Sequence, residues 1–283
     1  MNRFTSHFKW LVIMAVLFMP DRGNADQTHY SIGLGLEFAS GTYGTGTRTN
    51  TVFIPFTAAV YPSERLDFSV ELPFIYQSNN NVVTSLGSGM HGAQSTTGSS
   101  VAAPAGSSGM MGSSSGMGSG GMGQGGIGDI IVKAGYVLVP EKEQVPQIRP
   151  NVFIKFPTAD KNKSLGTGEY DGGFALEFWK WLDSWCAYAE AGYAIQGKTA
   201  AIALKNYLYY TIGAGYQVTE KFRPMFILKG STATVEGIDP LMEARLNLKY
   251  QTTQHVGIEG YLAKGITASS PDYGTGLAVF YDF

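Results

Sequence analysis

Cysteine, charge and long hydrophobic runs are all scarce in this sequence. Cys186 is the only cysteine, so the chain cannot form an internal disulfide bond and needs another source of stability. Charged residues make up 15% and the net charge is -2, so nothing suggests nucleic acid as a partner. After the N-terminal segment no run of about 18 apolar residues occurs, which excludes a later transmembrane helix.

The N-terminal segment has the features of a secretory signal peptide. Arg3 and Lys9 precede an apolar run from Trp10 to Met19, and Pro20 ends that run. Gly23-Asn24-Ala25 places small residues where signal peptidase cleaves. We therefore expect residues 1–25 to direct export and residues 26–283 to form the mature protein. An N-terminal anchor helix is the alternative.

Glycine and aromatic residues are abundant, and apolar residues alternate with polar ones. Glycine accounts for 37 residues and aromatics for 13%. Residues 66–76 place Leu66, Phe68 and Val70 on one face, and Asp67 and Glu71 on the other. Residues 148–156 and 242–250 repeat the pattern. A period of two indicates β-strands, and strands of about ten residues with aromatic ends are typical of membrane barrels.

The alternating segments predict an all-β fold, an antiparallel transmembrane β-barrel of about 12 strands. Short connections alternate with long ones, so short periplasmic turns and long extracellular loops are expected, with both termini periplasmic. A closed barrel also supplies the stability that a disulfide cannot. The expected strands span 28–39, 49–61, 66–78, 127–140, 147–157, 169–180, 184–197, 204–217, 221–232, 240–251, 254–265 and 273–283.

The longest expected extracellular loop is 79–128, which is rich in Gly, Ser and Met and contains no charged residue. Such a composition cannot bury a core, so this segment is predicted to be a flexible loop within one domain. A domain boundary is the alternative. Methionines accompany His91, and thioethers with imidazole suit Cu(I), although low complexity alone explains them. The methionines are Met90, Met110, Met111, Met117 and Met122.

The last expected strand ends in an aromatic residue. Leu277, Val279, Tyr281 and Phe283 share one face of this strand. The pattern resembles the terminal signature by which outer-membrane proteins are recognised for barrel assembly. It predicts a location in the outer membrane of a Gram-negative bacterium, with lipid and the barrel-assembly machinery as partners, the latter through Phe283.

Charged residues that alternate with the apolar face are expected to line the lumen, because lipid exposure of Lys or Arg costs about 2–4 kcal/mol at mid-depth. Their mixed signs argue against strong ion selectivity. A lattice of neutralising ion pairs is the alternative to a polar path for a solute. Tyr207, Tyr209 and Phe153 are expected in the lumen too. The candidate solute-binding residues are Glu71, Asp129, Lys133, Arg149, Lys155, Glu177, Lys205, Arg223, Glu243 and Arg245.

No enzyme, metal site or cofactor is predicted. His255 and His29 fall at the expected periplasmic end, away from the outer lipid boundary where a lipase would act. Gly166-Thr-Gly168 has neither the Lys-Ser/Thr nor the following helix of a phosphate-binding loop.

Three short blocks carry a family resemblance: Gly126–Ile130, Lys155–Asp160, and Leu165–Gly168 followed by Asp171. Their order resembles the MetA-pathway of phenol degradation family of outer-membrane transporters, barrels thought to move aromatic or hydrophobic compounds. We expect Asp160 and Asp171 to accept hydrogen bonds from loop amides. Asp129 and Lys155 are expected to point into the lumen from neighbouring strands and to pair across it.

The sequence therefore predicts an outer-membrane channel or passive transporter for small organic solutes, including aromatic or hydrophobic ones. Twelve strands lie between a filled eight-stranded barrel and an open porin of 16–18 strands, so conduction is compatible with the fold. The alternative is a non-conducting surface barrel whose Gly/Ser/Met-rich loop mediates interaction or metal capture.

Overall fold

The computed structural model describes residues 28–44, 47–78, 85–86, 110–111, 123–199 and 203–283, and nearly all of them lie in or between β-strands. Within these ranges one short 3₁₀ helix occurs, η1 (Lys161–Lys163), and no helix is long and apolar enough to cross a membrane. The strands are β1 (His29–Gly41), β2 (Thr49–Ser63), β3 (Leu66–Gln77), β4 (Ser85–Leu86), β5 (Met110–Met111), β6 (Gln124–Ile127), β7 (Ile130–Tyr136), β8 (Gln147–Phe156), β9 (Asp171–Leu182), β10 (Trp185–Ile195), β11 (Tyr207–Tyr216), β12 (Phe222–Ser231), β13 (Leu241–Gln251), β14 (Val256–Gly265) and β15 (Tyr273–Asp282).

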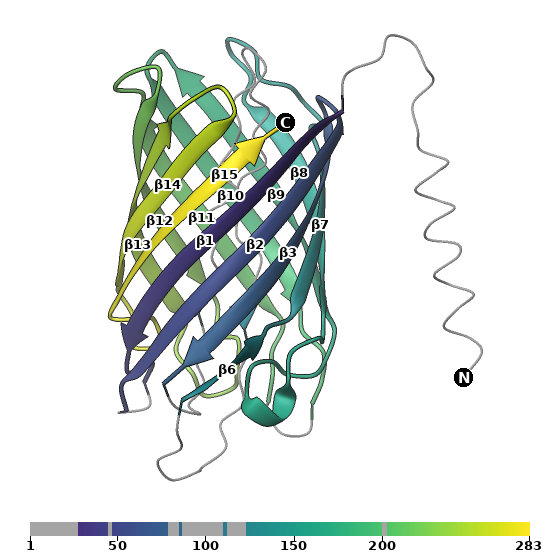
Figure 1. Ribbon diagram of the computed structural model, residues 1–283, viewed down its shortest axis with the longest axis vertical. Helices are drawn as coiled ribbons and strands as arrows, with labels where there is room; N and C mark the ends of the chain where they lie inside the picture. Colours follow the sequence, from purple (N-terminus) through teal and green to yellow (C-terminus); the bar gives the residue numbers. More distant parts are fainter. Residues whose placement is uncertain (1–27, 45–46, 79–84, 87–109, 112–122, 200–202) are drawn as a thin grey trace, which may run out of the picture.

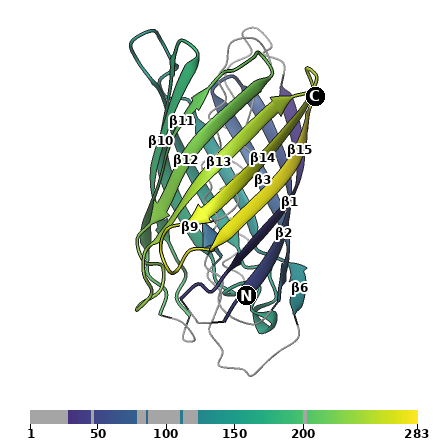
Figure 2. The same ribbon diagram turned by 90° about the vertical axis from the view of Figure 1, so that its left-hand side faces the viewer.

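The main sheet closes on itself to form a barrel. Each strand pairs antiparallel with its neighbour along the chain, and β1 pairs with β15 from Ser31↔Asp282 to Ser40↔Tyr273. β6 and β7 both pair with β3 and together take the place of one strand in the wall. The barrel therefore has twelve strands, as predicted. Figure 1 and Figure 2 show these strands running obliquely around the barrel. Closure gives each strand of the wall a partner on both sides, apart from β6, which pairs only with β3. Pairing of sheet edges is a requirement for a sheet in lipid.

The strand expected at 127–140 is wrong in its detail, because the structure has two shorter strands there. β3 pairs with β6 through Phe74–Gln77 and with β7 through Leu66–Glu71. Pro73 lies between these two stretches and has no amide hydrogen for the ladder, so the pairing is interrupted there. The Gly128 amide donates to the Pro73 carbonyl oxygen at 2.8 Å and bridges the interruption.

The connections alternate in length as predicted, except that residues 137–146 form a longer connection between β7 and β8. Asp183 and Ser184 alone join β9 to β10, and Asp183 adopts the left-handed φ of 55° that this tight turn needs. The turns of this kind lie at the end of the barrel where β15 stops (Figure 1). There the Phe283 amide donates to the Tyr30 carbonyl oxygen at 2.9 Å, so the start of β1 and the end of β15 meet. We call this end the short-turn end and the opposite one the long-loop end.

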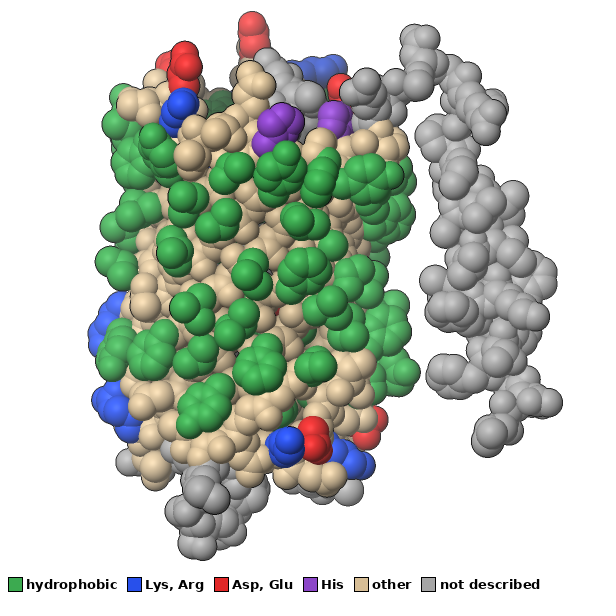
Figure 3. All heavy atoms as spheres, viewed as in Figure 1, with side chains coloured by type: hydrophobic (Ala, Val, Ile, Leu, Met, Phe, Trp, Pro, Cys, Tyr) green, Lys and Arg blue, Asp and Glu red, His purple; other side chains and the backbone are tan. Residues whose placement is uncertain are grey.

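The outer face of the barrel is apolar. Alternate residues of each strand expose large hydrophobic side chains, for example Leu34 at 56%, Leu36 at 57% and Phe226 at 58%. Figure 3 shows hydrophobic side chains covering the middle of one side, with acidic side chains at its two ends. A soluble protein rarely exposes so continuous an apolar surface, whereas a barrel in lipid requires one.

Large aromatic side chains of the inner face lie over glycines of the adjacent strand. Each such ring occupies the space that a Cβ on its glycine partner would fill, so the ring runs along the wall. Four aromatic–glycine pairs stand in direct register: Phe153–Gly173, Tyr209–Gly192, Tyr261–Gly276 and Phe280–Gly257.

Candidate functional site in the barrel interior

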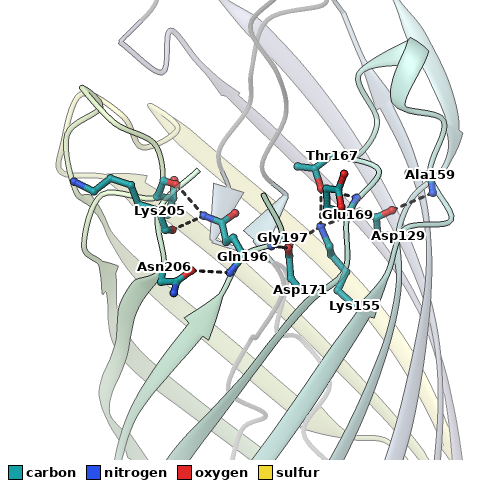
Figure 4. Close-up of polar contacts among 11 residues, drawn as sticks. Asp129, Lys155, Ala159, Thr167, Glu169, Asp171, Gln196, Gly197, Lys205 and Asn206 are labelled. Atoms are coloured by element: carbon teal, nitrogen blue, oxygen red, sulfur yellow. Dashed lines mark hydrogen bonds and ion pairs between the residues drawn. The ribbon is translucent and has the colours of Figure 1, made fainter. Parts of the chain in front are cut away.

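A buried ion cluster lies at the long-loop end of the interior. Lys155 Nζ is 2.6 Å from Asp171 Oδ2 and 3.0 Å from Asp129 Oδ2. These residues come from the end of β8, the start of β9 and the residue before β7, so three neighbouring strands meet here (Figure 4). The predicted pairing of Asp129 with Lys155 is present, but it joins the ends of adjacent strands along the wall and does not cross the lumen.

The same carboxylates hold the adjoining loops. Asp129 Oδ1 accepts from the Ala159 amide at 3.0 Å, and Asp171 Oδ1 accepts from the Gly197 amide at 2.9 Å. Lys155 Nζ also lies 3.4 Å from Thr167 Oγ1. The three sequence blocks that carry the family resemblance therefore converge on one cluster, which fixes the loop between β8 and β9. We call Asp129, Lys155, Thr167 and Asp171 the mouth cluster.

Two neighbouring features extend this anchoring. Asp160 Oδ1 accepts from the Asn162 amide at 2.9 Å, so the predicted loop-amide role of Asp160 is confirmed along with that of Asp171. Gln196, at the end of β10, donates through Nε2 to the carbonyl oxygens of Lys205 and Thr234, at 2.7 and 2.8 Å. Side-chain bonds of this kind fix the loops around the long-loop end (Figure 4).

A second ion cluster lies towards the short-turn end. Arg149 contacts Asp67 with two nitrogens, Nη2 to Oδ1 at 2.5 Å and Nε to Oδ2 at 3.0 Å. Its Nη1 donates to Glu177 Oε1 at 2.6 Å, and Asn151 Nδ2 donates to the same oxygen at 2.6 Å. The fork of an arginine suits two carboxylates at once, so this cluster joins β3, β8 and β9.

A third group occupies the opposite wall. Glu37 Oε2 accepts from the Tyr261 hydroxyl at 2.7 Å, and Arg245 Cζ lies 4.4 Å from the centre of the Tyr261 ring. Arg245 also donates to Glu243. Tyr261 thus contacts both a carboxylate and a guanidinium. Its ring and the Glu243 carboxylate together stabilise the buried Arg245 guanidinium.

An aromatic group on β9 and β10 includes residues that the sequence reasoning did not single out. Trp179 and Tyr188 are register partners with ring centres 6.0 Å apart, and Trp181 lies 5.9 Å from Trp179. Arg223 Cζ lies 5.4 and 5.5 Å from the centres of the Trp179 and Trp181 rings. The alternation within residues 169–180 could have predicted an inward position for Trp179, because Trp179 shares a strand face with Glu177.

The remaining predicted lumen residues fall into two groups. Glu71 on β3 and Lys133 on β7 are half-buried on the inner face and interact electrostatically with each other. Lys205 is different: it is exposed in the segment before β11, so its expected lumen position is wrong. The expected strand began at 204, but β11 begins at Tyr207. The predicted lumen aromatics Phe153, Tyr207 and Tyr209 are all buried in one interior cluster.

The described residues offer no metal centre, since no group of three or more His, Cys, Asp or Glu side chains lies close enough together there. His255 Nδ1 lies 2.8 Å from the Asp282 carbonyl oxygen, so the histidine contacts the end of β15 at the short-turn end. Residues 1–25, for which a signal peptide is predicted, fall outside the described residues, as do His91, Met90, Met117 and Met122.

A closed barrel of twelve antiparallel strands, apolar outside and charged inside, defines an outer-membrane-type β-barrel. Residues 91–283 match the family described as "Putative MetA-pathway of phenol degradation", which is more than half of the chain. The protein belongs to this family, in agreement with the resemblance of its sequence blocks. Comparison with curated proteins finds no match.

Solved structures of outer-membrane barrels share the fold. An outer membrane channel from Pseudomonas putida F1 has a TM-score of 0.61 at 13% identity, covering 93% of this chain and 99% of that one. The KdgM porin has a TM-score of 0.51 at 10% identity, covering 89% of this chain and 99% of that one. At these identities the comparison shows a shared fold, the closed antiparallel barrel predicted for this chain.

Proposed function

We propose that this protein is an outer-membrane channel through which small organic solutes, including aromatic ones, diffuse passively. The observation that carries the proposal is the inner face. Four of its aromatic side chains lie along the wall over glycine partners: Phe153, Tyr209, Tyr261 and Phe280. Charged side chains of both signs line the same face from Asp67 near the short-turn end to Asp171 near the long-loop end.

The aromatic character of the interior supports the class of solute. Trp179, Tyr188, Tyr207 and Tyr209 are buried on the inner face together with polar groups. Flat apolar rings bind other flat rings through their faces and edges. The family description refers to phenol degradation, which is consistent with an aromatic solute.

The ten lumen candidates take different parts in this proposal. Asp129 and Lys155 act through the mouth cluster, and Arg149 with Glu177 stabilises the wall. The other candidates that face the interior remain candidates for solute contact: Glu71, Lys133, Arg223, Glu243 and Arg245. We do not retain Lys205, because it lies outside the barrel strands.

Planar-bilayer recording of the refolded protein tests the proposal. We expect stepwise conductance, with current reduced by an added aromatic solute. A matched variant lacks residues 87–122, which leaves every barrel strand in place. Absence of conductance in both proteins would overturn the channel proposal and favour a non-conducting surface barrel.

We also propose outer-membrane lipid and the barrel-assembly machinery as partners. The apolar outer face supports the first, and the terminal aromatic residue Phe283 supports the second.

A further inference from the structure

Arg223, near the start of β12, is an inner arginine without an acidic partner. The other two inner arginines, Arg149 and Arg245, both pair with carboxylates. Among the described residues, by contrast, no carboxylate forms an ion pair with Arg223 and no acceptor forms a hydrogen bond with its guanidinium. The residue is half-buried, so part of it remains accessible inside the barrel.

Two tryptophans of β9 hold this guanidinium. Arg223 Cζ lies 5.4 Å from the centre of the Trp179 ring and 5.5 Å from the centre of the Trp181 ring. The arginine therefore reaches across β10 and β11. Cys186 and Gly215 stand in register with Trp181 on those two strands, and they are small enough to leave room for the contact. Contact with a ring stabilises the positive charge, but it supplies no acceptor oxygen for the N–H groups.

The tryptophans add donors of the same kind. The indole nitrogens of Trp179 and Trp181 are buried, and neither has a hydrogen-bond partner in the part of the chain that the structure describes. Trp181 as a residue is only half-buried, so the group is not sealed from the interior space. Indole and guanidinium groups donate hydrogen bonds and cannot accept them. A buried donor without an acceptor is costly, so these side chains call for a ligand that accepts.

Two carboxylates near this group are already paired. Glu259 acts electrostatically on Arg223, but it forms its ion pair with Lys249 at 3.6 Å. Glu141 accepts from the Trp181 amide at 2.7 Å and pairs with a lysine of β9 at 3.1 Å. The positive charge of Arg223 therefore remains available for a negatively charged acceptor. A carboxylate suits it best, because its two oxygens match the fork of a guanidinium.

We propose that Arg223, Trp179 and Trp181 form a binding site for a small carboxylate at the short-turn end of the barrel. Trp181 precedes the last residue of β9 and Arg223 follows the first residue of β12, so both lie beside short turns. The guanidinium and indole N–H groups donate to the carboxylate, and the organic part of the ligand packs against the rings. The inference rests on the proposed channel function, for which it names an anionic class of solute.

Binding of two fluorinated probes to the refolded protein in detergent tests the site by ¹⁹F NMR. 4-Fluorobenzoate and 4-fluorobenzamide have nearly the same shape, but only the benzoate is charged at neutral pH. We expect the benzoate to bind at least about tenfold more tightly, and Arg223→Met to abolish this preference. Arg223→Lys keeps the charge without the fork and should retain part of it. Trp181→Phe keeps a ring without the donor, so it should weaken the benzoate about three- to tenfold and leave the benzamide unchanged.

The control is Arg65→Met, which makes the same change at an exposed arginine in the turn between β2 and β3, at the same end of the barrel. Its affinity for 4-fluorobenzoate should match that of the unaltered protein. If Arg223→Met does not fold, Arg223→Lys and Trp181→Phe still report the carboxylate preference. Equal binding of the two probes, a preference insensitive to the Arg223 and Trp181 variants, or an equal loss in Arg65→Met would overturn the site.

Conductance is measured separately, so the two proposals fail in distinguishable ways. Arg223-dependent binding of benzoate by a protein that does not conduct would overturn the channel function and support the site. Conductance without Arg223-dependent binding would overturn the site and leave the channel function standing.

Discussion

Lys155→Met is the substitution most informative about the mouth cluster. The side chains of Lys155, Asp129 and Asp171 are only 4%, 4% and 7% exposed. Methionine has a similar length but no charge, so the two carboxylates would remain buried and would repel each other. Removing one partner of a buried ion pair costs about 3–5 kcal/mol. This corresponds to roughly two to four orders of magnitude in the opening equilibrium of the attached loop.

Limited trypsin digestion measures that opening at a defined place. Lys161 and Lys163 form the 3₁₀ helix in the loop that the mouth cluster fixes, so cleavage there reports release of the loop. We expect cleavage of Lys155→Met to be at least about 100-fold faster than that of the unaltered protein. The barrel strands should stay resistant, because every backbone hydrogen bond of a closed barrel must break together.

Two matched variants sharpen the result. Lys180→Met removes a pair with Glu141 whose side chains are 19% and 18% exposed, and it should cost about 1 kcal/mol or less. Combining Lys155→Met with Asp129→Asn and Asp171→Asn removes the uncompensated charge and should recover most of the protection. If Lys155→Met were no more sensitive than Lys180→Met, the buried-charge reasoning would be refuted.

Three further predictions concern the wall. Gly192→Val should displace the Tyr209 ring, which occupies the space of the new side chain, and should lower single-channel conductance; unchanged conductance would contradict the wall packing. Leu34→Arg places a charge on the lipid face and should destabilise the protein by about 2–4 kcal/mol in liposome unfolding titrations, whereas Leu34→Phe should be nearly neutral. Deleting Phe283 should reduce the heat-modifiable, folded form in outer membranes while leaving total synthesis unchanged, and normal assembly would argue against its role as a recognition signal.

The strands could be predicted because the outer face must satisfy lipid along its whole length. Leu66, Phe68 and Val70 on β3 can only alternate with Asp67 and Ser69 if one side meets lipid and the other meets the interior. Each strand of the wall has one face towards lipid and one towards the interior. The two-residue alternation of apolar and polar side chains is therefore visible in the sequence. It weakens only where a strand leaves the lipid, and there the expected boundaries were inaccurate.

The errors have local physical causes. At β6 and β7, the missing amide of Pro73 interrupts the ladder, and an apolar–polar pattern does not record hydrogen bonds. At Lys205, the predicted strand began too early, because β11 begins only at Tyr207. The Lys205 carbonyl oxygen accepts from the Gln196 side chain and not from a neighbouring strand. Both features depend on a partner distant in sequence.

Side-chain partnerships were less predictable than faces. That Glu177 and Arg149 point inward followed from alternation, but their contact with each other and with Asp67 requires the register of three strands. Register in a barrel is set by strand number, stagger and tilt together, which a single strand does not reveal. Asp129 and Lys155 could be anticipated because the family blocks placed them at the same end of neighbouring strands.

The glycine content gains a different explanation from the structure. The sequence contains 37 glycines, many of them in the segment 79–128, and their role within the strands was not predicted. Yet Gly173, Gly192 and Gly276 lie within strands, each beneath an aromatic ring of its register partner. A side chain at these positions would push the ring towards the barrel axis. Glycine opposite an inward aromatic residue therefore lets the ring lie along the wall, which is consistent with the proposed passage of flat solutes.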